Sequence, residues 1–132
     1  MSDETVYKLV GTDEWATAMR RGSFEGAGID LVDGYVHLST GAQVAETARR
    51  HFAGRAALTL VAVDPGALGP SLRWEPSRGG DLFPHVYGAV EPAAVLWAEP
   101  LELPETPDGE RVAEAVRRVL RARGHVGTDT AE

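Results

Sequence analysis

The stretch "AALTLVAVD", residues 56–64, is an apolar run that contains β-branched valine and threonine residues. A run of this length and composition is typical of a strand that is buried on both faces of a sheet. We therefore predict that it forms the central strand of the fold, and the other elements are placed around it.

Segments rich in β-branched and aromatic residues predict further strands, and apolar residues at helical spacing predict helices. About six strands and three helices result, and they do not alternate as β-α-β units, so we expect an α+β fold. Residues 22–33 are expected to form a loop, and residues 65–70 a turn or one short helical turn. The other strands are predicted at 5–11, 34–39, 71–75, 84–88 and 93–103, and the helices at 13–21, 40–53 and 107–123.

Several residues mark the expected ends of these elements. Thr12 is the expected cap of the first helix, and Thr40 and Gln43 have capping-box spacing at the start of the second. Pro107 fits the first turn of the last helix, and Pro100 confines its strand to an edge or a bulge. The last helix is expected to bury the stripe Val112, Val116, Val119 and Leu120.

Composition and charge limit the class of protein. A chain of 132 residues fits one domain, since domains commonly hold about 100–200 residues. The absence of cysteine excludes disulfides, thiolate metal sites and a cysteine nucleophile. A net charge of −7, with Lys8 as the only lysine, argues against bulk nucleic-acid binding but leaves a local pocket for a small anion open. No leader peptide or membrane span is visible, so we expect a cytoplasmic protein.

The first candidate site residues lie on the predicted strand 34–39. Side chains alternate along a strand, so Tyr35, His37 and Ser39 should share one face while the apolar residues between them face a core. The strand leads into a helix N-terminus at Thr40, where backbone N–H groups favour anions. We expect His37 to donate to a ribose hydroxyl or a phosphate. The alternative is a surface histidine beside a helix cap.

The second candidate segment is "RWEPSRGGDLFPHVYG", residues 73–88. Gly79 and Gly80 allow the backbone to approach a ligand closely. Arg78 presents a forked donor that suits phosphate or carboxylate. Asp81 is expected to position Arg78 or to accept from a ligand hydroxyl. The alternative is a packed loop in which Arg78 and Asp81 simply pair with each other.

The same segment holds aromatic and histidine side chains. His85 and Tyr87 alternate onto one face of a strand, and Trp74 and Phe83 are expected to supply an apolar or stacking wall. His37 and His85 do not have the spacing of metal ligands, and we predict no metal site.

Several segments together resemble one bacterial family. They are VYKLV (6–10), Trp15, GSFEG (22–26), DGYVHLST (33–40), QV (43–44), HF (51–52) and LRWEPSRGGDLFPHVYG (72–88). From about Val6 to Leu101 the chain resembles the domain-of-unknown-function 952 family. We accordingly expect residues 1–103 to hold the family domain with a ligand cleft. Residues 104–132 would add a linker, a C-terminal helix and a frayed tail to the same domain.

The family is similar in fold to the ADP-ribosyltransferases, which cleave nicotinamide adenine dinucleotide (NAD) in a cleft between two small sheets, and RNA 2′-phosphotransferases share that architecture. The resemblance implies two small sheets and a pocket lined by both motifs. It matches His37, followed by Ser39 and Thr40, to the histidine that holds the nicotinamide ribose.

The resemblance does not locate the carboxylate that such enzymes commonly place on a later strand. That carboxylate binds the ribose hydroxyl and stabilises an oxocarbenium-like transition state. Glu75, Asp81 and Glu99 are the candidates in this chain.

Three functions follow as hypotheses. The first is an ADP-ribosyl- or phospho-transferase or hydrolase that acts at a ribose, with NAD as substrate and no cofactor required. Its catalytic residues would be His37, Asp81 and Glu75. The second is a non-catalytic module that binds a nucleotide or small anion, and the third is a structural or partner-binding protein. The expected substrate-binding residues are Ser39, Thr40, Arg78, Gly79, Gly80, His85, Tyr87 and Trp74.

Overall fold

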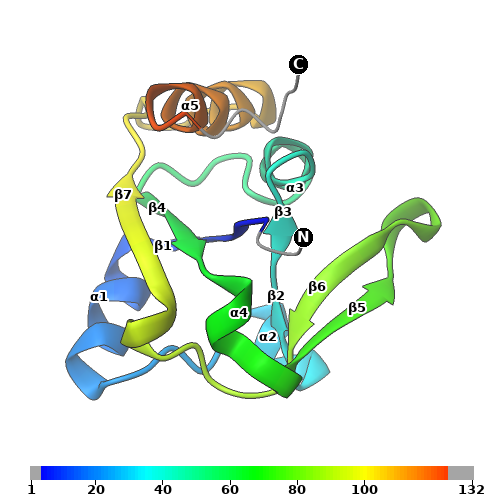
Figure 1. Ribbon diagram of the computed structural model, residues 1–132. Coiled ribbons are helices and arrows are strands. Elements are labelled where there is room, and N and C mark those ends of the chain that lie inside the picture. Colours follow the sequence, from blue (N-terminus) through cyan, green and yellow to red (C-terminus); the bar gives the residue numbers. More distant parts are fainter. Residues whose placement is uncertain (1–3, 125–132) are drawn as a thin grey trace.

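The computed structural model describes residues 4–124, except for the side chain of Arg78. Within these residues it has two antiparallel sheets and five α-helices, which confirms the α+β class although the helices and strands outnumber the prediction. Figure 1 shows the β5–β6 hairpin of the second sheet extending away from the body of the molecule. One sheet has the order β3-β1-β4-β7 and the other β2-β6-β5.

The strands are β1 (Val6–Gly11), β2 (Val36–His37), β3 (Ser39–Thr40), β4 (Leu58–Val63), β5 (Leu72–Pro76), β6 (Leu82–Val86) and β7 (Val95–Pro100). The helices are α1 (Thr12–Arg21), α2 (Ile29–Asp33), α3 (Val44–His51), α4 (Pro65–Leu68) and α5 (Gly109–Ala122).

β4 is the buried central strand that the apolar run predicts. It lies between β1 and β7, and each of its six side chains is buried. Val61 and Val63 pack in one hydrophobic core, whereas Leu58 and Leu60 pack in a second core on the opposite face. Pro100 ends β7 at the edge of the sheet, as predicted, where its missing N–H interrupts no ladder.

The second core lies under α3 and α5, which pack side by side (Figure 1). Gly109 permits this approach, because a Cβ at that position would lie 2.3 Å from the carbonyl oxygen of Arg49. The predicted stripe of α5 is confirmed, since Val112, Val116, Val119 and Leu120 are all buried in this core.

The predicted helix starts are displaced by local capping. α1 begins at Thr12 with Gly11 as its cap, and the Thr12 hydroxyl instead bonds the Thr59 hydroxyl at 2.9 Å. α3 begins at Val44, although the predicted pair is in contact: the Gln43 side-chain oxygen accepts from the Thr40 N–H at 3.0 Å.

The start predicted for α5 is wrong by two residues. The helix begins at Gly109 rather than at Pro107. Asp108 is the cap, and its carboxylate accepts from the Arg111 N–H at 2.8 Å. The Asp108 carboxylate accepts from a backbone N–H in the first turn of the helix, whereas a proline side chain offers no acceptor for it.

The single strand predicted at 34–39 is wrong, because the chain crosses here from one sheet to the other. β2 pairs with β6, and β3 pairs with β1. Val36 and Leu38 face the first core as predicted. Ser39 does not share the face of His37, since it is 4% exposed and its hydroxyl lies 3.0 Å from that of Thr47 on α3.

The loop predicted at 22–33 contains the one-turn helix α2. Gly28 and Gly34, both at positive φ, flank it. Its pattern gave no helical signal, because the buried residue is Asp30 while the aliphatic side chains face outward. Those exposed side chains are Ile29, Leu31 and Val32.

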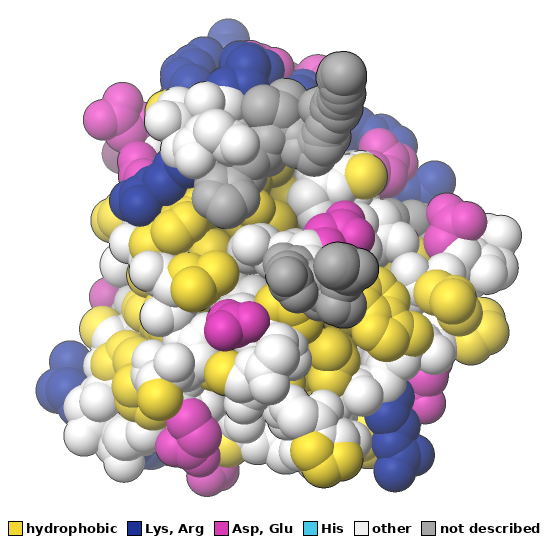
Figure 2. All heavy atoms as spheres, viewed as in Figure 1, with side chains coloured by type: hydrophobic (Ala, Val, Ile, Leu, Met, Phe, Trp, Pro, Cys, Tyr) yellow, Lys and Arg dark blue, Asp and Glu magenta, His cyan; other side chains and the backbone are white. Residues whose placement is uncertain are grey.

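The outer face of α5 is charged. Figure 2 shows basic side chains gathered over this helix at the top of the view. Arg117 and Arg121 bind Glu114, and Arg123 binds Glu99 at 2.9 Å, which indicates a solvated face. Among the residues that the structure describes, no helix has the length and apolar character needed to span a bilayer.

Candidate functional site

A buried carboxylate is the centre of the candidate site. α2 carries Asp30 into the interior, where its side chain is inaccessible to solvent. One oxygen accepts from the Lys8 ammonium at 2.8 Å and from the Ala27 N–H at 3.1 Å. The other lies 2.6 Å from His37 Nδ1 and accepts from the His37 N–H at 3.0 Å. Four contacts therefore fix Asp30 between β1 and β2.

Asp30 and Lys8 form an ion pair in which each charge stabilises the other. Burial by itself would raise the pKa of Asp30, but hydrogen bonds from His37 and the charge of Lys8 outweigh it and lower the pKa to about 2. Burial lowers the pKa of Lys8, and the charge of Asp30 opposes that change. The Lys8 ammonium also donates to the carbonyl oxygen of His37 at 3.0 Å.

His37 lies between two carboxylates. Its Nδ1 faces Asp30, and its Nε2 lies 3.0 Å from Oδ2 of Asp33 at the end of α2. A carboxylate only accepts, so both contacts are hydrogen bonds only when the ring carries a proton on each nitrogen. The His37 side chain is 28% exposed and Asp33 is 37% exposed, so solvent reaches the outer contact and not the inner one.

A second histidine lies directly across the sheet. His37 and His85 are partners in the β2–β6 register, and their ring centroids are 5.3 Å apart. The Glu75 carboxylate lies 2.7 Å from His85 Nδ1 and accepts from the Tyr87 hydroxyl at 2.9 Å. Hydrogen bonds from His85 and Tyr87 lower the pKa of Glu75. The hydrogen bond between Tyr87 and Glu75 also raises the pKa of Tyr87.

Tyr35 joins the two histidines. Its ring centroid lies 4.5 Å from that of His37, 4.3 Å from that of His85 and 5.0 Å from that of Tyr87. Burial raises the pKa of the Tyr35 hydroxyl, and nearby carboxylates, Asp33 first, raise it further. The four rings form one contiguous polar and aromatic face on the three-stranded sheet.

A cavity of about 590 Å³ extends from His37 between the two sheets. β1 lines it from the four-stranded sheet, and His37 and Phe83 line it from the three-stranded sheet. Ser39 of β3 lines it from the four-stranded sheet, and Glu14 and Arg55 line it beside Gly11, the last residue of β1. A cavity of this size is typical of small-molecule sites.

Some predicted site residues come together and others do not. His37 and Ser39 line the cavity, and Glu75, His85 and Tyr87 adjoin His37 on the sheet face described above. The remaining residues lie elsewhere.

Trp74 lies between Arg73 and Glu75 in β5, so its side chain points to the opposite face of the sheet from Glu75, and it is 43% exposed. Thr40 lies in β3, ahead of α3, and its backbone N–H donates to the side-chain oxygen of Gln43. Glu99 lies on the edge strand β7, where its carboxylate accepts from the Arg123 side chain.

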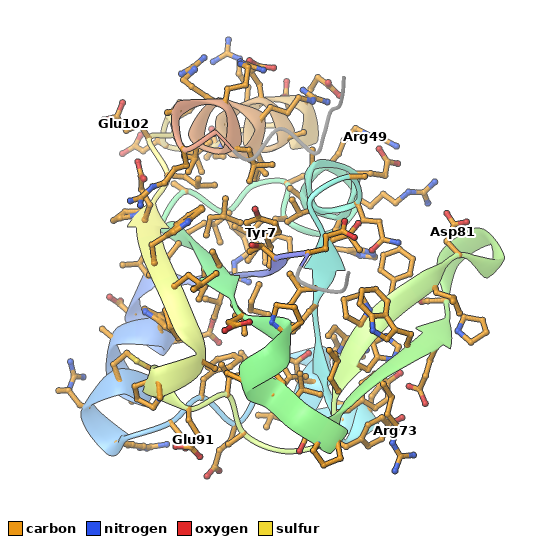
Figure 3. The ribbon with its side chains drawn as sticks, viewed as in Figure 1. Tyr7, Arg49, Arg73, Asp81, Glu91 and Glu102 are labelled. Atoms are coloured by element: carbon orange, nitrogen blue, oxygen red, sulfur yellow. The ribbon has the colours of Figure 1, made fainter. Side chains whose placement is uncertain are left out.

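The hairpin tip is separate from this face. Figure 3 shows Asp81 at the tip and Arg73 at the other end of β5. Gly79 and Gly80, both at positive φ and exposed, form the turn, and the Ser77 N–H donates to the carbonyl of Asp81. The Arg78 side chain is outside the described part of the chain, so its expected pairing with Asp81 stays a prediction.

The residues that hold His37 in place are not among the predicted site residues. Asp30 and Asp33 lie in a segment predicted as a loop, and their partners are distant in sequence. One signal was present: Lys8 interrupts the apolar strand "VYKLV", and a lone cation among buried residues indicates a buried anion as its partner.

Comparison with known proteins identifies relatives of this chain. The sequence profile of a family described as "Protein of unknown function (DUF952)" matches residues 9–98. Among curated proteins there is no match.

Solved structures similar to this chain include those of protein CC0527 from Caulobacter crescentus. Its crystal structure is 42% identical, with a TM-score of 0.74, and the match covers 79% of this chain and 93% of that one. Its solution NMR structure is 43% identical, with a TM-score of 0.68, over 78% and 90% of the two chains. The present chain is therefore a member of the DUF952 family, whose function is described as unknown.

Proposed function

We propose that the cavity between the two sheets binds an NAD-like nucleotide, and that the protein acts on its ribose as a transferase or hydrolase. The observation that carries this proposal is the fixation of His37 at the cavity wall by the buried pair of Lys8 and Asp30. Clusters of perturbed, buried ionisable groups beside a cavity are typical of functional sites.

Two small sheets with a cavity between them support the resemblance to ADP-ribosyltransferases. In the proposed complex, His37 Nε2–H donates to a ribose hydroxyl in place of Asp33, which is exposed enough to turn away. Ser39 supports the adjoining wall through its bond to Thr47.

The proposed reaction breaks the bond between the ribose anomeric carbon and the nicotinamide nitrogen. The electron pair of that bond leaves with nicotinamide, and water or an acceptor hydroxyl attacks the carbon. Glu75 is the proposed carboxylate that takes the proton of the attacking group, because it lies on the same sheet face as His37 and is joined to it through His85. Tyr35 and Tyr87 give this face aromatic surface for a ring.

A non-catalytic nucleotide-binding module is the second candidate. The observation that favours it is that the Glu75 carboxylate is already bound by His85 and by the Tyr87 hydroxyl. A carboxylate held in this way orders the sheet face without accepting a proton from substrate.

One pair of measurements tests both candidates. Calorimetric titration with NAD is expected to show binding to the wild type and at least about tenfold weaker binding to His37→Ala. Chromatographic detection of released nicotinamide then separates the enzyme from the binding module. Absence of binding by a folded wild type at millimolar NAD would refute both.

A further inference from the structure

Arg55 lines the cavity beside Gly11, the last residue of β1. Its side chain is 49% exposed and lines the cavity together with Glu14 and Phe52. The guanidinium carbon lies 5.5 Å from the centroid of the Phe52 ring, which supports it from one side. This part of the cavity lining is therefore cationic, acidic and aromatic.

The contact between Arg55 and Glu14 is weak. A single guanidinium nitrogen lies 3.4 Å from Oε1 of Glu14, and that oxygen also accepts from the Gly11 N–H at 3.2 Å. Both side chains are about half exposed, and ion pairs of this kind contribute little. A phosphate, in contrast, accepts two parallel N–H bonds from an arginine fork. Phosphate is thus a better partner for Arg55 than Glu14 is.

The other fixed cation at the cavity is already committed. Lys8 donates to buried Asp30 and to the carbonyl of His37, so displacing it would leave Asp30 without its counter-charge. Lys8, in the middle of β1, donates to the carbonyl oxygen of His37, and Gly11, the last residue of β1, lies beside Arg55. Three residues of strand separate these two points by roughly 10 Å, at about 3.3 Å per residue.

We propose that this cavity takes a phosphorylated ligand, with its phosphate or diphosphate on Arg55 and its sugar at His37. Glu14 is the partner of Arg55 until the phosphate replaces it. The position of the sugar rests on the proposed function above, whereas the anion site at Arg55 stands on its own geometry. The chemical class of ligand is a nucleoside phosphate and not a free nucleoside.

The test compares adenosine, ADP and inorganic pyrophosphate by calorimetry at low ionic strength. Arg55→Gln is expected to weaken ADP and pyrophosphate at least about tenfold and to leave adenosine unchanged. Glu14→Gln removes the competing charge while keeping an oxygen for the Gly11 N–H, so it is expected to tighten both anions severalfold. Arg50→Gln is the matched control, because Arg50 is similarly exposed on α3 but binds Glu46. Thermal melts verify that each variant is folded.

The outcomes separate this inference from the proposed function. If ADP binds and Arg55→Gln behaves like Arg50→Gln, the inference is overturned while nucleotide binding stands. The same holds if Arg78→Gln, and not Arg55→Gln, abolishes the advantage of ADP over adenosine. If pyrophosphate binds through Arg55 but neither NAD nor ADP binds more tightly than pyrophosphate, the anion site stands and the nucleotide proposal fails. If no anion binds to the wild type, both fail.

Discussion

The two sheets of this protein use buried residues in opposite ways. In the four-stranded sheet, β4 presents apolar side chains to a core on each face. In the three-stranded sheet, one face joins the first core while the other carries histidines, tyrosines and carboxylates in mutual contact. Apolar burial needs only shape and volume, whereas a buried polar face needs every partner in place. The comparison indicates that apolar burial holds the first sheet together and that the polar face of the second depends on specific contacts between side chains.

The largest expected effect on this comparison comes from Asp30. Asp30→Ala leaves the Lys8 ammonium buried without its counter-charge, and breaking such a pair from one side costs about 3–5 kcal/mol. Urea denaturation measures the loss in the free energy of unfolding. Asp33→Asn is the control, because it touches the same histidine from an exposed position and should change stability little. A cost for Asp30→Ala no larger than that of the control would show that the network is not structural.

The apolar sheet gives the matching measurement. Leu60 is fully buried on β4, and Leu60→Ala is expected to cost about 2–5 kcal/mol through lost burial and the cavity that remains. The same denaturation experiment then compares Asp30 with Leu60 directly. If Leu60→Ala cost under about 1 kcal/mol, β4 would not be the centre of the fold.

The pH dependence of stability sharpens the contrast, because Asp30, which joins Lys8 of β1 to His37 of β2, titrates, whereas the apolar side chains of β4 do not. Its folded pKa of about 2 lies below the ordinary value of 3.8, so its contribution is present above about pH 4 and is lost as the pH falls towards 2. That contribution is about 2 kcal/mol. The wild type should therefore lose about that much more stability than Asp30→Asn between pH 5 and pH 2.

Glu46 provides a control for this titration. Its pKa is also about 2, because Arg49 and Arg50 donate to it, but the group is exposed on α3 and salt screens it. Glu46→Gln should change the acid slope less than Asp30→Asn, and the difference should grow with added salt. Equal slopes for the two variants would assign the acid sensitivity to the surface and not to the buried pair.

The smallest effect is expected at the outer edge of the polar face. Tyr87→Phe removes the hydroxyl that donates to Glu75 and keeps the ring beside Tyr35. Because the group is exposed, water replaces the lost donor, and the melting temperature should fall less than for either buried variant. Differential scanning calorimetry checks this order. A fall as large as that of Leu60→Ala would mean that the tyrosine holds the sheet together.

The comparison also explains which parts of the structure are predictable from the sequence. β4 and the stripe of α5 follow from local pattern, because burial on one or both faces leaves a periodic trace in the chain. The meeting of His37 with His85 depends on strand register between residues far apart, which no local pattern encodes. Asp30 was missed for a related reason. A one-turn helix has too few residues to show periodicity, and the partners of Asp30 come from β1 and β2.

The site prediction shows the same division. The pairing of β2 with β6 brings the segment around His37 beside the hairpin of residues 73–88. Alternation within the hairpin, however, separates Trp74 from Glu75, and the turn carries Gly79 and Gly80 away from the histidines. The sequence shows where such residue types cluster, and the pairing of the strands decides which of them share a face.

The most direct test of the central claim is an NMR titration of the ¹⁵N-labelled protein with ADP-ribose. The account predicts that backbone amides on both sides of the cavity, His37, Ser39 and Arg55 among them, shift together with one dissociation constant. It is contradicted if saturating ligand shifts no amide, or if the shifts are confined to the hairpin tip around Gly79 and Gly80.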